Sequence, residues 1–186
     1  MPYHHGDLRR ALLDTALEAV AEHGPAAVSL RDVARRAGVS HAAPTHHFRD
    51  KTGLLTALAA EGWALLADAL RAAAADDRGF AEPGVAYVVF ATSHPAHFAV
   101  MRAPGLARPD DPDLVAAMAR ARSELEKGVE GFEGGSGRDR RSTALAAWSL
   151  VHGLAALILE GAVPLEPGAD VAGLARAVTA RLRAPG

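Results

Sequence analysis

Residues 29–51 constrain the fold more than any other part of the chain, because they contain two short helices separated by a tight turn. Ser29 followed by Asp32 three residues later is a helix N-terminus pattern. Gly38 stands where a helix ends on a residue with positive φ, and Ser40 is placed to cap the next helix through its hydroxyl. Two helices joined in this way form a helix-turn-helix, whose second helix enters the DNA major groove. The segment therefore predicts DNA binding.

The remaining sequence also follows a helical period, so the predicted fold class is all-α, with about nine helices. We expect an N-terminal three-helix DNA-binding domain at residues 1–52, with the helix-turn-helix at about 28–48. Residues 53–186 are expected to form a second domain, a helical bundle. A helix over 113–131 is expected to turn inward four apolar side chains: Leu114, Val115, Met118 and Leu125. The glycine-rich run Glu133–Gly137 lacks the Lys-Ser/Thr ending of a phosphate-binding loop and is expected to be a loop tip.

Charge and apolar content narrow the class of protein. The formal net charge is −2, but residues 28–53 carry five basic and two acidic side chains, a local +3 that suits a DNA-reading segment. The chain has no cysteine, which excludes disulfides and thiolate chemistry. Leu145–Leu159 is apolar but short for a bilayer, and is typical of a buried helix. With no apolar N-terminal stretch, we expect a cytoplasmic protein without a membrane partner.

Several motifs resemble those of the TetR family of bacterial transcriptional regulators. Over the first third of the chain, the shared features are Gly38-Val39-Ser40, His47-Phe48, Lys51 and Leu54-Leu55. Trp148, followed after three residues by His152-Gly153, and His94-Pro95 resemble one TetR subgroup. Thr45 and His46 depart from the pattern, because the family usually has an aromatic residue and then a varied one there. The resemblance implies a homodimeric, ligand-responsive repressor.

The resemblance also implies which side chains meet DNA. Arginine binds guanine bidentately, threonine bonds a base or a phosphate, and an alanine methyl packs on the thymine methyl. A lysine beside a helix N-terminus is suited to anchor a phosphate. The predicted DNA contacts are Arg31, Ser40, His41, Ala42, Ala43, Thr45, His46, His47 and Lys51.

Two further sets of residues are expected in the bundle domain. Aromatic, sulfur and imidazole groups gather in two segments that form either an ordinary core or the lining of an effector pocket: Phe90, His94, Phe98, Met101, Trp148 and His152. Small and apolar residues on the last two helices predict a four-helix dimer interface: Ala147, Leu150, Leu154, Leu157, Ile158, Leu174 and Val178.

The predicted function is a repressor that binds a pseudo-palindromic operator as a homodimer and responds to a small-molecule effector, with no cofactor, metal or catalytic residue. One alternative is a helical ligand carrier whose head no longer binds DNA, motivated by Thr45 and His46. The other is an all-α metal-dependent enzyme, since six of the nine histidines lie in residues 1–53. Against it, adjacent histidines such as His46 and His47 point in different directions on a helix.

Overall fold

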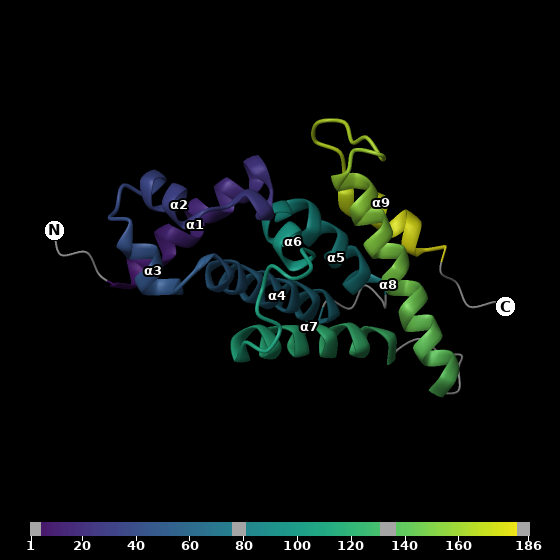
Figure 1. Cartoon of the computed structure of the whole chain (residues 1–186). Helices are drawn as coiled ribbons and strands as arrows, with labels where there is room; N and C mark the ends of the chain where they lie inside the picture. Colours follow the sequence, from purple (N-terminus) through teal and green to yellow (C-terminus); the bar gives the residue numbers. More distant parts are fainter. Residues whose placement is uncertain (1–4, 76–80, 131–136, 182–186) are drawn as a thin grey trace. The chain divides into compact units, whose positions relative to one another are not determined.

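The computed structural model describes residues 5–75, 81–130 and 137–181, which form helices and connecting turns without a strand (Figure 1). The all-α class is confirmed. The expected loop tip Glu133–Gly137 falls outside the described residues except for Gly137, which begins a helix. The elements are α1 His5–His23, the 3-10 turn η1 Pro25–Ala27, α2 Leu30–Arg36, α3 Ala42–Phe48, α4 Lys51–Ala75, α5 Glu82–Ser93, α6 Pro95–Met101, α7 Pro112–Glu130, α8 Gly137–Leu159 and α9 Val171–Thr179.

The chain divides into two compact units, and neither is continuous in sequence. The first unit comprises residues 1–63 and 94–118, and the second comprises 64–93 and 119–186. This division differs from the expected boundary at residue 52. The reason is local to the first unit, where α6 packs against α1 and the chain after α6 returns to the start of α4. The first unit thus holds α1–α3 together with a segment that follows much later in the chain.

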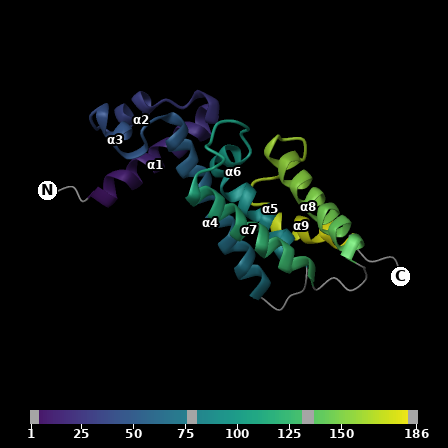
Figure 2. The same ribbon diagram turned by 60° about the horizontal axis from the view of Figure 1, so that its bottom comes forward.

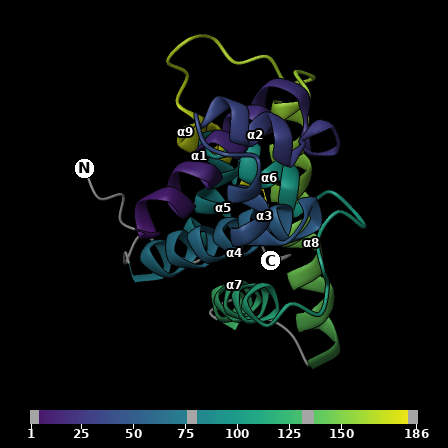
Figure 3. The same cartoon turned by 60° about the vertical axis from the view of Figure 1, so that its left-hand side comes forward.

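The core of the first unit is built from the apolar stripes of several helices. α1 packs against α2, α3 and α6 (Figure 3). The stripe of α4 at Leu54, Leu55 and Leu58 is fully buried, as its i, i+1, i+4 spacing requires of one helix face. Other members of this core, from α1, α2, α3, α6 and α7, are Leu12, Val33, Phe48, Val100 and Leu114.

The helix-turn-helix has most of the local signals that the sequence predicts. The Ser29 hydroxyl accepts a hydrogen bond from the Asp32 N–H (3.2 Å), and Gly38 has a φ of 67°. The expected hydroxyl cap from Ser40 is wrong, because His41 precedes the first residue of α3 and no side chain caps that helix. The Ala43 N–H is already bonded to the Ser40 main-chain carbonyl (3.0 Å), which leaves the hydroxyl without that donor.

The second unit is organised around α5, which packs against both α8 and α9 (Figure 2). Gly84 allows this approach, since a Cβ there would lie 3.1 Å from Val151 Cγ1. Arg176 of α9 donates two hydrogen bonds, of 2.8 and 3.1 Å, to the buried Glu82 carboxylate of α5. These contacts fix α9 on α5.

Two expectations about buried apolar faces are wrong. Val115 and Met118 are 48 % and 43 % exposed, because the buried face of α7 runs through Leu114, Ala117 and Ala121 at i, i+3 and i+7. The run 145–159 is not a buried helix within this chain. By length and composition α4 and residues 141–159 of α8 are apolar enough to cross a membrane, but half of the α4 window is buried and only 17 % of the α8 window is.

Candidate nucleic-acid interface

α3 presents a compact exposed face formed by the residues predicted to read DNA. Pro44 is tolerated at the third position of α3, because the first N–H groups of a helix lack intrahelical partners. Pro44 and Phe48 are buried at i and i+4, which turns the opposite side of the helix outward. Ser40, His41, Ala42, Thr45 and His46 are exposed, and Ala43 and His47 are half-buried. The structure therefore gathers seven of the nine predicted DNA contacts on and beside one short helix.

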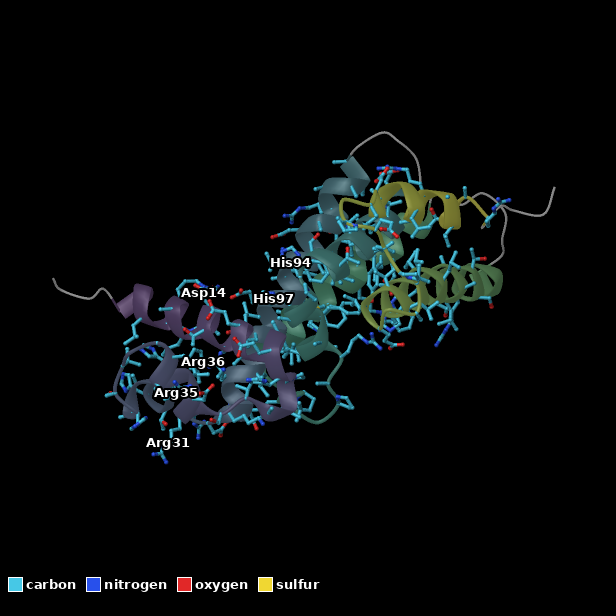
Figure 4. All side chains as sticks on the ribbon, turned by 90° about the horizontal axis from the view of Figure 1, so that it is seen from above. Asp14, Arg31, Arg35, Arg36, His94 and His97 are labelled. Carbon is cyan, nitrogen blue, oxygen red and sulfur yellow. The ribbon has the colours of Figure 1, made fainter. Side chains whose placement is uncertain are left out.

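α2 contributes three arginines with different electrostatic surroundings. Arg35 and Arg36 each bond the Asp32 carboxylate at 2.6 Å, and Arg36 also pairs with Glu22 at 2.7 Å. These hydrogen bonds, first that of Arg35, lower the pKa of Asp32 below its usual value. Arg31 has no ion-pair partner within the described segments, and Figure 4 shows it pointing away from the helix. Arg31, the predicted DNA contact, is thus the arginine of α2 whose charge is not used internally.

The junction between α3 and α4 is a sharp reversal. Arg49 follows the last residue of α3 with a φ of 69° and a ψ of −53°, a rare γ-turn conformation in which the Asp50 N–H donates to the Phe48 carbonyl at 2.9 Å. Asp50 then accepts the Gly53 N–H at 2.8 Å and caps α4, as expected for an aspartate at this position. Lys51 is half-buried, and its Nζ donates to the Ala26 carbonyl of η1. The predicted phosphate anchor is therefore hydrogen-bonded within the chain in this structure.

Arg9 is a cation beside the predicted interface that the sequence analysis did not identify. The Arg9 guanidinium lies 5.4 Å from the centre of the Phe48 ring, a cation–π contact between α1 and α3. Arg9 is exposed and adds positive charge next to the recognition helix. No local pattern identifies it, because the contact joins helices that are far apart in sequence.

A polar chain links three helices of the first unit. The buried His97 of α6 is 3.0 Å from Glu61 Oε1 of α4, and the Glu61 Oε2 atom accepts from Arg10 of α1 at 2.6 Å. Gly62 brings α6 close to α4, since a Cβ there would lie 3.1 Å from the His97 Cβ. His94 and His97 have ring centres 6.0 Å apart (Figure 4). Burial lowers the pKa of His97, although the Glu61 carboxylate opposes this shift.

We predict that His97 makes the protein less stable in mild acid. Its folded pKa lies below the ordinary value of 6.5, so the unfolded chain binds the proton more readily as the pH falls. The stability that depends on neutral His97 is therefore present above that value and lost as the pH decreases through the folded pKa. Urea unfolding at about pH 7.5 and about pH 5.5 should show a smaller loss for His97→Gln, which keeps an N–H for Glu61 but does not titrate. Equal losses in both proteins would contradict this role.

The predicted pocket residues fall in both units. His94, Phe98 and Met101 belong to the first unit, and Phe90, Trp148 and His152 to the second. Within the second unit, the His152 and Trp148 rings lie 5.4 Å apart, and Tyr87 Oη is 2.7 Å from His152 Nδ1. Tyr87 was missed from the sequence, since only packing between α5 and α8 brings it to His152. Among the described residues, no three or more histidine, aspartate, glutamate or cysteine side chains form a group that could hold a metal.

The predicted dimer residues differ in their exposure within this single chain. Leu157 is 46 % exposed and Leu154 only 9 %. The others are half-buried: Ala147, Leu150, Ile158, Leu174 and Val178. Three large apolar residues of α8 beyond this set, Leu145, Trp148 and Leu159, are also exposed.

Comparisons with known proteins agree with this arrangement of a helix-turn-helix unit and a helical bundle. Residues 12–58 match the family model of bacterial regulatory proteins of the tetR family, and residues 80–182 match that of the tetracyclin repressor-like C-terminal domain. The chain belongs to the TetR family. It is a DNA-binding transcriptional regulator, and the resemblance of its sequence to the TetR family as a whole is confirmed.

Three relatives are similar to this TetR-family regulator over different lengths of the chain. A protein of unknown function from Rhodococcus sp. RHA1 is 36 % identical, with a TM-score of 0.77 over 98 % of this chain and 96 % of that one. A tetR-family regulatory protein from Rhodococcus RHA1, 21 % identical with a TM-score of 0.72 over 95 % of each chain, shares the fold. The regulator BetI of Escherichia coli is 45 % identical over 62 residues, which are 33 % of this chain and 32 % of BetI.

Proposed function

We propose that this TetR-family regulator is a cytoplasmic, ligand-responsive repressor that binds a two-fold symmetric operator as a homodimer and catalyses no reaction. The observation that carries the proposal is the contrast between two exposed surfaces. One is the polar face of α3 in the first unit, and the other is the apolar surface of α8 in the second. The first is suited to a groove of DNA, and the second to another apolar surface.

The α8 surface supports the homodimer. Leu145 and Leu157 are 57 % and 46 % exposed in the single chain, and exposed large apolar side chains on one helix favour contact with a partner surface. A second copy covers such a surface by two-fold symmetry, with α8 and α9 of both chains forming a four-helix bundle. Two related recognition helices then read two half-sites, which gives more specificity than one head supplies.

The effector is proposed to act through the second unit, where Tyr87, Trp148 and His152 combine aromatic surface with a hydrogen-bonding imidazole. Such a combination favours a mostly apolar ligand with one polar group. The ligand relieves repression only if it binds the non-operator conformation more tightly. The Tyr87→Phe variant lacks only the hydroxyl beside His152. The concentration of an effector compound that releases the protein from its operator should differ between this variant and the wild type.

We predict that Arg31→Ala weakens binding to the selected operator by about 1–3 kcal/mol, since a guanidinium that reads a base edge is worth about that much. Lys51→Ala should weaken binding to all duplexes about equally, because a phosphate contact carries no sequence information. Genomic-fragment selection followed by titration at several salt concentrations measures both effects. If neither variant changes DNA affinity, α2 and the start of α4 do not contact the operator.

A further inference from the structure

The loop between α6 and α7 returns to the start of α4, beside the recognition helix. The Arg108 N–H donates to the hydroxyl of the buried Thr56 at 2.9 Å, which fixes the loop backbone on α4. From there the Arg108 side chain reaches Asp50, with Nη2 donating to Oδ2 at 2.7 Å. Residue 108 lies in the stretch that matches the C-terminal family model, yet both contacts are with the DNA-binding unit.

Asp50 uses its two carboxylate oxygens for different partners. Oδ1 accepts the Gly53 N–H and caps α4, whereas Oδ2 accepts from Arg108. The Gly53 hydrogen bond, and then the charge of Arg108, keep the pKa of this carboxyl below its usual value, so it is ionised near neutral pH. The geometry is tight, since a Cβ on Gly53 would lie 3.0 Å from Arg108 Nη1. The same Cβ would lie 2.0 Å from the carbonyl oxygen of Phe48, the last residue of α3.

We propose that Arg108 is a positioning residue for operator recognition. By holding Asp50, which lies between the two helices, Arg108 fixes the angle between α3 and the start of α4. The proposal rests on operator binding by α3 and assigns a part in it to the loop at residues 102–111. Arg108 and Asp50 have side chains 33 % and 56 % exposed, and exposed ion pairs contribute little to the free energy of unfolding. The effect of this pair should therefore appear in DNA affinity rather than in stability.

The test compares Arg108→Ala and Asp50→Asn, alone and combined, in the full-length protein. Asparagine retains an oxygen for the Gly53 cap but cannot pair with the guanidinium. The probes are a duplex that the wild type selects from a random-sequence library and a scrambled duplex of equal length. Arg120→Ala is the matched control, since Arg120 forms a similar exposed pair with Asp68 at 2.8 Å in the second unit.

Each single variant should weaken binding to the selected duplex by about two- to fivefold, because an exposed ion pair can shift the population of the binding-competent conformation only by its own small free energy. The double variant should lose no more than either single variant, because both act through one contact. Arg108→Lys should recover part of the affinity. The scrambled duplex, the thermal midpoint and the Arg120→Ala control should change little, and the slope of affinity against salt should stay at the wild-type value.

Three results would overturn the proposal. If Arg108→Ala reduces the salt slope by about one and Asp50→Asn tightens all DNA binding, Arg108 is a phosphate contact that Asp50 merely neutralises. If the variants lower the thermal midpoint and leave operator affinity unchanged, the pair is structural only. If the wild type enriches no duplex from the library, operator binding itself fails, and the positioning role fails with it.

Discussion

Leu157→Glu should convert the proposed homodimer into folded monomers that no longer bind operator DNA. In the single chain Leu157 is 46 % exposed, so a carboxylate there remains hydrated and the second unit keeps its core. In a two-fold dimer the carboxylates of both chains are buried at the interface without a partner. Each uncompensated buried charge costs about 3–5 kcal/mol. Sedimentation at micromolar concentration should show the monomer, while circular dichroism shows unchanged helix content.

The matched control is Val115→Glu, which places the same charge on α7 at a residue 48 % exposed. It should leave both the dimer and operator affinity unchanged. Leu174→Glu should combine dissociation with some loss of stability, because Leu174 is half-buried on α9 already in the single chain. A wild-type monomer, or a Leu157→Glu protein that remains dimeric, would show that α8 does not form the interface.

Gly53→Ala should destabilise the protein and weaken operator binding, although alanine is the better helix former. The added Cβ would lie 2.0 Å from the Phe48 carbonyl oxygen, a main-chain atom that also accepts the Asp50 N–H at 2.9 Å. Relieving the clash requires α3 and α4 to separate. Overpacking of this kind costs about 1–3 kcal/mol or more, against a gain of about 1 kcal/mol in helix propensity. We expect a lower thermal midpoint and a loss of operator affinity of at least about tenfold.

Gly153→Ala is the control variant, because it changes helix propensity without introducing a steric clash. Gly153 lies within α8, and a Cβ there meets nothing within 4 Å, so alanine should raise the stability of the chain by up to about 1 kcal/mol. Chemical unfolding of the two variants measures the difference. Equal stability changes at residues 53 and 153 would show that the approach of α3 to α4 is less tight than the structure indicates.

The sequence predicts those features whose determinants lie within a few residues. The Ser29 cap and the positive φ of Gly38 both follow from neighbouring groups and residue type. The same local reasoning fails at Ser40, where a main-chain carbonyl competes for the donor. It fails again at Val115 and Met118, because an apolar residue does not reveal which face of its helix the neighbouring helices cover.

Contacts between helices distant in sequence could not be predicted at all. Arg9 meets the Phe48 ring, Tyr87 meets His152, and Glu61 joins Arg10 to His97 only after the helices have packed. Such side chains carry no signal of their own in the sequence, since arginine or glutamate on a helix is ordinarily solvated. The assignment of residues 94–118 to the DNA-binding unit was missed for the same reason.

That discontinuous unit limits how this regulator can be recombined with others. A chimera joined at residue 52 would carry the recognition helix to a foreign effector domain but leave behind Leu54, Leu55 and Leu58, which belong to the same apolar core as residues of α1 and α3. It would also lose Val100 and Leu114, which belong to the same core. A functional exchange of specificity between regulators of this kind must therefore move residues 1–63 and 94–118 together, or replace only the exposed residues of α2 and α3 within the intact chain.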